Sequence, residues 1–267
     1  GNELENLNAW QRMTAHRLLL ERQDKAAVPL LEQLAKGRNR LPEARVQAMH
    51  LLDALGAMNF ALLERQLEDS EPAVAEHAIQ LAEPRLANSP ALVTRVLNLA
   101  EDPNPRVRFQ CALSLGVSAD ERVVPALVRI VTQNLDDKWT RAAVLSAIAQ
   151  HEDKFLHALL PVMADKPSGS FPALMGELGR ILGASLAQPK LLPVMRELSA
   201  GSRPENLAWQ MAAMGGLGEG LRARGLGSKD TPALLSLVKE DAANLSMQLA
   251  GLFQRSAGLA LDGQRPL

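Results

Sequence analysis

Five positions that recur about every 33 residues constrain the fold of this chain more than any other feature. They are Arg12, Arg45, Ala75, Arg108 and Arg141, and successive members lie 33, 30, 33 and 33 residues apart. Each of these register positions is followed three residues later by a mostly small residue and seven residues later by a mostly larger apolar one. A period in the low thirties with helical spacing inside each copy predicts a solenoid, in which each repeat packs only on its neighbours.

The clearest copy of the repeat is EDPNPRVRFQCALSLG, residues 101–116. Pro103 and Pro105 prevent a helix from running through the start of this segment and therefore predict a turn. Apolar residues then recur at helical spacing, at Val107, Cys111, Ala112 and Leu115. Arg108 lies one turn into the predicted helix, beside the apolar stripe. We call this helix the second helix of its repeat.

The chain is expected to begin half-way through a repeat, with a second helix over residues 7–23. Its core contacts are predicted to be Trp10, Met13, Leu18 and Leu20. Seven helix pairs are expected to follow, at 25–36 with 42–56, 59–68 with 71–87, 90–100 with 104–116, 121–134 with 137–150, 153–164 with 172–186, 189–199 with 205–222, and 231–240 with 245–260. The predicted fold class is therefore an all-α, α-α superhelix with about seven helix pairs plus a leading half repeat.

The repeats define the expected domain organisation. Residues 1–150 carry regular repeats and residues 151–267 looser ones, so that residues 1–267 are predicted to form a single domain. The chain begins at Gly1 rather than at a methionine, and we interpret it as a fragment of a larger chain.

The composition fits closely stacked helices and argues against a nucleic-acid partner. Aromatic residues make up only 3% of the chain and tyrosine is absent, which leaves little surface for base stacking. The net charge is −1 and the pI about 6.6, so no global basic field attracts nucleic acid or an anionic membrane. No apolar run approaches the roughly 18 residues of a membrane span, and no membrane segment is expected in this chain.

No catalytic, metal or cofactor site is predicted. The histidines include no pair four residues apart, although His16 and His50 occupy nearby repeat positions and could face one groove. Cys111 lies in an apolar stripe where sister repeats carry alanine, and no CxxCH motif is present for covalent haem. The close-set glycines at 215–220 follow no strand and lack the lysine of a phosphate loop, so we interpret them as sites where two helices approach.

Arginines at the register positions and three tryptophans are the candidate docking residues. Trp10 and Trp139 lie two residues before a register arginine, and Trp209 lies two residues before Met211, which continues the register. On a concave surface formed by second helices, the candidates are Trp10, Arg12, Arg45, Arg108, Trp139, Arg141 and Trp209. A structural alternative stays open for both residue types. The arginines can form a stacking ladder with turn aspartates, pairing Asp102 with Arg108 and Asp136 or Asp137 with Arg141, and the tryptophans can pack one repeat on the next.

Four predicted helical segments resemble HEAT repeats: NAWQRMTAHRLLLER, EHAIQLAEPRL, DPNPRVRFQCALSLG and WTRAAVLSAI. More narrowly, they resemble the HEAT-repeat region of large multidomain dehydrogenase and haem-binding proteins of planctomycetes and verrucomicrobia. The resemblance implies a HEAT/armadillo-like solenoid in an exported, periplasmic protein, beside a β-propeller and a c-type cytochrome domain. Catalytic and haem-binding residues would then belong to those neighbouring domains.

The function predicted from these observations is that of a non-catalytic helical-repeat scaffold for docking proteins or adjacent domains within a larger redox protein. One alternative is a HEAT-like DNA glycosylase, which would need a strongly cationic groove to offset phosphate charge. A second alternative is a HEAT-type lyase or chaperone that presents a tetrapyrrole or an apoprotein. The sequence does not discriminate this second alternative from generic docking.

Overall fold

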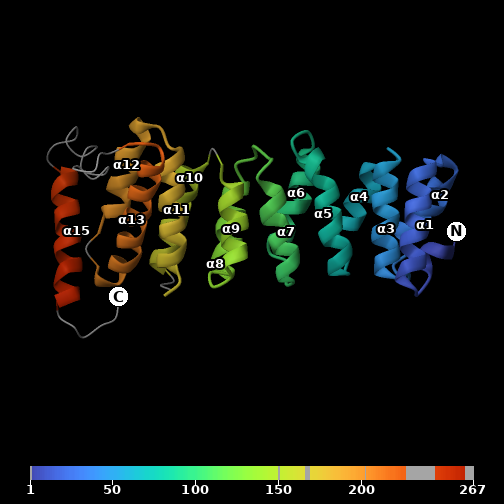
Figure 1. The fold of residues 1–267 in the computed structure, drawn as a ribbon, viewed down its shortest axis with the longest axis horizontal. Helices are drawn as coiled ribbons and strands as arrows, with labels where there is room; N and C mark the ends of the chain where they lie inside the picture. The colour runs from blue at the N-terminus through green and yellow to red at the C-terminus, as the bar shows by residue number, and fades with distance from the viewer. Residues whose placement is uncertain (1, 150, 166–168, 202, 227–243, 262–267) are drawn as a thin grey trace. The chain divides into compact units, whose positions relative to one another are not determined.

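The computed structural model describes residues 2–149, 151–165, 169–201, 203–226 and 244–261 (Figure 1). Within these ranges every regular element is helical, which confirms the predicted all-α solenoid of helix pairs. The α-helices are α1 (Ala9–Arg22), α2 (Val28–Lys36), α3 (Pro42–Ala54), α4 (Phe60–Leu67), α5 (Pro72–Leu86), α6 (Pro90–Leu99), α7 (Pro105–Leu115), α8 (Val123–Gln133), α9 (Lys138–Ala147), α10 (Glu152–Asp165), α11 (Phe171–Ser185), α12 (Gln188–Ser199), α13 (Leu207–Ala223) and α15 (Asn244–Leu261). Short 3-10 turns are η1 (Asn2–Glu5), η2 (Lys25–Ala27) and η3 (Pro204–Asn206).

The observed helices begin and end close to the predicted boundaries because the turn residues cap them. Asn104 accepts a hydrogen bond from the N–H of Arg106 at 2.9 Å and so caps α7. Asp137 caps α9 in the same way, with the N–H groups of Trp139 and Thr140 at 3.1 and 3.2 Å. The predicted helix at 231–240 lies outside the described residues.

Contacts within the chain group its residues into two compact units, residues 1–130 and 131–267, with the boundary inside α8. In unit 1 the first helices α2, α4 and α6 pack on the second helices α3, α5 and α7 of their own repeats. The second helices also pack on one another, α1 on α3, α3 on α5 and α5 on α7 (Figure 1). This arrangement buries the predicted stripe: the residues three and seven positions after the register position are fully buried at Ala48, Leu52, Ala78, Ala82, Cys111 and Leu115.

Helix α1 differs from the other second helices, and its predicted core contacts are wrong. Trp10 and Met13 are 71% and 66% exposed, Leu18 and Leu20 are also exposed, and α1 has no buried residue. Leu18 is exposed because no first helix of its own repeat covers α1 in the described part of the chain, whereas its equivalent on α3, Leu51, is fully buried. Trp10, Met13 and Leu20 occupy positions that stay partly or fully exposed on α3 as well. The stripe is present in the sequence, but its burial depends on the number of neighbouring helices.

In unit 2, helices α11 and α13 lie side by side at a backbone distance that only glycine permits (Figure 1). A Cβ atom at Gly216 would lie 2.1 Å from the carbonyl oxygen of Gly176, and one at Gly220 would lie 2.1 Å from that of Arg180. Gly179 on α11 is equally close to Ala213 on α13. The glycines therefore let two helices approach, as predicted, and they form a glycine seam.

Candidate functional site

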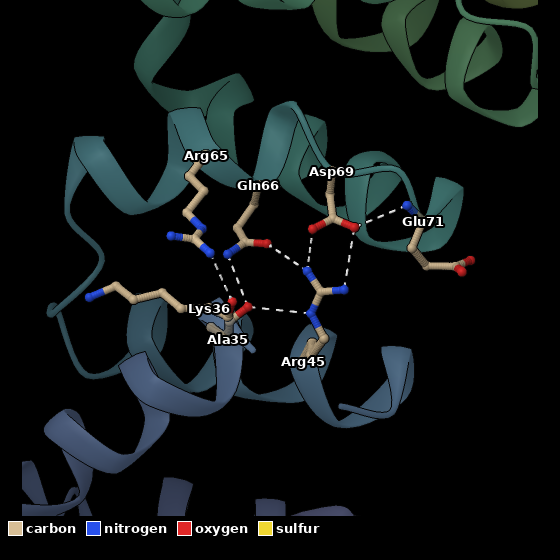
Figure 2. A network of polar contacts seen from close by, with 7 residues as sticks. All are labelled: Ala35, Lys36, Arg45, Arg65, Gln66, Asp69 and Glu71. Atoms are coloured by element: carbon tan, nitrogen blue, oxygen red, sulfur yellow. Dashed lines mark hydrogen bonds and ion pairs between the residues drawn. The ribbon is translucent and has the colours of Figure 1, made fainter. Parts of the chain in front are cut away.

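Arg45, one of the predicted docking residues, is a buried connector between repeats (Figure 2). Its side chain is only 2% exposed and forms an ion pair with Asp69, which follows α4 of the next repeat. The guanidinium also donates hydrogen bonds to the Gln66 side chain at 3.1 Å and, through Nε, to the carbonyl oxygen of Ala35 at 3.4 Å. This network joins α3 to the next helix pair and leaves Arg45 inaccessible to a partner.

The carboxylate of Asp69 is held in its charged form by this network. Burial opposes ionisation of Asp69, but hydrogen bonds from Arg45 and from the backbone N–H of Glu71 outweigh burial and lower its pKa. The Glu71 N–H lies 3.0 Å from the carboxylate. The pair is therefore an ionic contact with its polar atoms satisfied, which is the arrangement that a buried ion pair needs.

The other register arginines hold the turn of their own repeat. Arg12 donates to the carbonyl oxygen of Asn6 at 2.7 Å, Arg108 to that of Asp102 at 2.7 Å, and Arg141 to that of Leu135 at 2.8 Å. In each case the carbonyl lies six residues before the arginine. This regularity supports a structural role for the register position, because a backbone carbonyl at a turn lacks an intrahelical partner.

The predicted main partner of Arg141 needs correction. Arg141 forms its ion pair with Glu177 of the next repeat at 3.0 Å, while Asp136 and Asp137 contribute weaker electrostatic attraction that also raises its pKa. Asp137 caps α9. Arg108 contacts the turn at Asp102 through the backbone carbonyl oxygen. A sequence shows which residues carry carboxylates. It does not show which backbone carbonyl oxygens accept hydrogen bonds from these arginines, because every residue has a carbonyl.

The three predicted tryptophans have different surroundings. Trp10 in unit 1 and Trp139 in unit 2 are 71% and 65% exposed, so packing between repeats does not account for them. Lys138 lies with its Nζ 5.1 Å from the centre of the Trp139 ring. Trp209 is half-buried and donates from Nε1 to Asn206 at 3.3 Å. Trp10 and Trp139 thus remain candidates for contact with a partner.

A polar ladder that the sequence analysis missed links the second helices of unit 1. Nε2 of His50 lies 3.0 Å from Nδ1 of His77, which joins α3 to α5. Gln80 donates to Gln110 at 3.1 Å, which joins α5 to α7. His50 and Gln80 each lie five residues after a register position. Their partners, His77 and Gln110, each lie two residues after the next register position. We call each of these two contacts a rung of the polar ladder. This offset is visible in the sequence once the register is known.

The ladder and its surroundings have mixed charge. Asp53 pairs with Arg85, Glu76 lies 3.0 Å from Arg106, and Glu83 accepts a hydrogen bond from the Ser114 hydroxyl at 2.7 Å. Carboxylates therefore alternate with arginines along the second helices of unit 1. This distribution differs from the continuous cationic stripe that binds a phosphate backbone.

Burial is the largest cause of the pKa shifts of Cys111 and His50, two titratable groups that could support catalysis. The pKa of Cys111 is raised, first by burial and then by the Asp102 carboxylate, so its thiol stays protonated. The pKa of His50 is lowered by burial and by the neighbouring His77 and His16, while Asp53 opposes this shift.

The described residues include no group of three or more His, Cys, Asp or Glu that could hold a metal ion. Among them, too, no helix combines the length and hydrophobicity needed to cross a membrane.

The comparisons with known proteins agree with the repeat architecture. Residues 60–149 match the family model for HEAT repeats, and this segment runs from α4 to just beyond α9. Three of the four segments that resemble HEAT repeats in the sequence analysis lie within it. A comparison with curated proteins gave no match.

Proposed function

We propose that this chain is a non-catalytic helical-repeat scaffold that docks another protein or a neighbouring domain on its second helices. HEAT repeats are generally non-catalytic and commonly mediate protein interactions, and such repeats cover residues 60–149. The observation that carries the proposal is the exposure of Trp10 and Trp139 at the same repeat position, two residues before the register arginine. Tryptophan is enriched among the residues that dominate binding energy at protein interfaces.

A narrower form of the proposal concerns the parent protein. The resemblance of the second helices to large dehydrogenase and cytochrome proteins supports a role as a spacer and docking surface between a β-propeller and a c-type cytochrome domain. Such a protein would be exported to the periplasm. The reading frame on either side of this chain tests this form: a propeller upstream and a CxxCH motif downstream would support it, and a free-standing reading frame would refute it.

The charge distribution favours protein docking over the enzymatic alternatives. A DNA glycosylase that holds duplex in its groove needs phosphate contacts, whereas Glu76 and Asp53 place carboxylates on the second helices of unit 1 and pair with the arginines there. Cys111 is buried with a raised pKa, so it is not an activated nucleophile. Titration with labelled duplex DNA at physiological salt is expected to show no saturable binding.

Site-specific photo-crosslinking in the native cells tests the docking function. One variant of the parent protein carries a photoreactive amino acid in place of Trp139. The control carries it in place of Phe60, which is 56% exposed on the first helix α4. We expect covalent adducts with a protein or a neighbouring domain from position 139 and not from position 60. Equal yields from both positions, or none from either, would refute docking through the second helices.

A further inference from the structure

A groove on the second-helix surface of unit 1 is lined mainly by one side of α1. Its lining residues are Trp10, Met13, Thr14, His16, Arg17 and Leu20 of α1, together with Gln47 of α3. The apolar members are open to solvent, at 71% exposure for Trp10, 66% for Met13 and 38% for Leu20. We call this feature the α1 groove.

The combination of three large apolar side chains is specific to α1 among the second helices of unit 1. The position of Met13 is also apolar on α3 and α7, at Val46 and Phe109, but on α5 the positions of Met13 and Leu20 hold Glu76 and Glu83. Leu20 also corresponds to Asp53 on α3. A role in stacking would call for similar residues in successive repeats, because each repeat meets the same neighbours. A cluster of exposed apolar side chains that only one repeat carries instead points to an external contact.

The α1 groove is also distinct from the surface that receives a first helix. In the complete repeat formed by α2 and α3, the positions equivalent to Trp10, Met13 and Leu20 are Glu43, Val46 and Asp53, and all three remain partly or fully exposed. The buried side of α3 consists of other residues, among them Ala44, Ala48 and Leu52. A further solenoid helix packed on α1 would therefore leave the α1 groove open, and its occupant is a partner on the second-helix surface.

The spacing of the groove residues favours a helical occupant. Trp10, Met13, Arg17 and Leu20 follow one another at intervals of three, four and three residues. These intervals are the a and d spacing of a coiled-coil seam, along which a second helix packs nearly parallel or antiparallel to the first. The seam is amphipathic, because its a and d positions include the exposed cation Arg17.

The positive charge of α1 indicates the chemistry of the occupant. Helix α1 carries three arginines and one glutamate, and Arg17 has only a loose pairing with Glu21, at 3.6 Å between highly exposed side chains. Arg17 lines the groove, so an occupant with a carboxylate beside its apolar residues would complement it.

We propose that the α1 groove binds an acidic amphipathic helix of a partner protein, with apolar side chains of that helix packed on Trp10, Met13 and Leu20 and a carboxylate facing Arg17. This inference rests on the proposed docking function and names the partner of one part of the second-helix surface. Trp10 is the anchor, because it is the largest exposed apolar side chain in the groove.

Fluorescence anisotropy with a designed peptide tests the proposal on the 267-residue chain. The labelled peptide has about three heptads, with leucine at a and d and glutamate at e and g, where mutual repulsion also keeps the peptide monomeric. We expect saturable binding that weakens about 30-fold in Trp10→Ala, which corresponds to the loss of about 2 kcal/mol typical of an interface hot spot. Phe60→Ala is the matched control, since it removes an exposed aromatic ring from α4, and its affinity should equal that of the wild type.

A charge exchange separates the proposed geometry from non-specific apolar binding. Arg17→Glu should weaken binding of the glutamate peptide and strengthen binding of a peptide with lysine at the same positions. A peptide of the same composition without the heptad spacing should not bind. Circular dichroism of each variant checks that the fold is retained, as the exposure of Trp10 predicts.

Several outcomes would overturn the proposal. Absence of peptide binding, equal binding of the scrambled peptide, or unchanged affinity in Trp10→Ala would reject the α1 groove as a site for an acidic helix. A concentration-dependent dimer that Trp10→Ala dissociates would assign the groove to a second copy of the chain. If crosslinks still form at position 139 in any of these cases, the docking function stands and only this groove is rejected.

Discussion

Gly215 and Gly216 are neighbours in α13, yet the structure predicts opposite effects when each is replaced by alanine. A Cβ atom at Gly215 meets no atom within 4 Å. A Cβ atom at Gly216 would lie 2.1 Å from the carbonyl oxygen of Gly176 and 2.9 Å from the backbone nitrogen of Arg180. Both contacts are with backbone atoms of α11, so no side-chain rotation can relieve them.

The expected free-energy changes follow from two terms. Alanine is favoured over glycine inside a helix by about 1 kcal/mol, so Gly215→Ala should stabilise unit 2 by about that amount. At Gly216 the same gain is opposed by overpacking, which costs about 3 kcal/mol when the surroundings cannot relax. The net expectation is a loss of about 2 kcal/mol in Gly216→Ala, because α11 and α13 must separate along the whole glycine seam.

Amide hydrogen exchange followed by mass spectrometry measures this effect where it arises. Exchange reports local stability, so peptides from α11 and α13 can be compared with peptides from α3 and α5 in the same sample. Exchange in α11 and α13 should become about 30-fold faster in Gly216→Ala and about fivefold slower in Gly215→Ala, while α3 and α5 stay unchanged. Equal protection in the two variants would refute the close approach of the two helices.

Three further predictions concern buried or half-buried polar groups of unit 1. Asp69→Ala leaves the Arg45 guanidinium buried without its carboxylate and should lower the free energy of unfolding by about 3–5 kcal/mol in urea titrations, whereas a loss below about 1 kcal/mol would contradict its structural role. The lowered pKa of His50 means that the folded state disfavours its protonation, so stability should be full above the ordinary pKa of 6.5 and decline as the pH falls below it. His50→Gln should flatten this decline in urea midpoints between pH 7.5 and 5, and an unchanged slope would argue against His50 as its source. Cys111, with its raised pKa, should resist a thiol reagent at pH 8 until the protein is unfolded, and rapid labelling of the native protein would contradict its burial.

Most of the fold could be predicted because a repeat places the same residue types in the same surroundings many times. The register positions located every second helix up to α9, and the apolar positions after them, such as Ala48 and Leu115, are buried as expected. The interpretation of the α13 glycines as helix-contact residues is confirmed for Gly216 and Gly220 but not for Gly215. These predictions depended only on the spacing of residues along one helix, and this spacing can be read from the sequence.

The surroundings of individual side chains could not be predicted in the same way. Trp10 and Met13 were expected in the core, but they lie at repeat positions that neighbouring helices leave open, as the partly or fully exposed Glu43 and Val46 on α3 show. Arg108 was expected to contact a carboxylate, and its turn contact with Asp102 is through a carbonyl oxygen, which residue identity does not reveal. The His50–His77 rung could have been found, since its offset repeats in the next rung.

On this solenoid, residues that recur in successive repeats have structural roles, and exposed residues that vary between repeats are candidates for partner binding. Arg12, Arg108 and Arg141 repeat the same turn contact, so replacing Arg108 or Arg141 by glutamate would disturb a repeat before it tested any docking surface. Two residues earlier, the corresponding positions hold Trp10 and Trp139 at the surface but other residue types in the repeats between them. Stacking constrains the first set equally in every repeat, whereas a partner touches only the repeats that it covers. Partner specificity should therefore be sought at the exposed, variable positions, and the tryptophans rather than the register arginines are the residues whose replacement tests it.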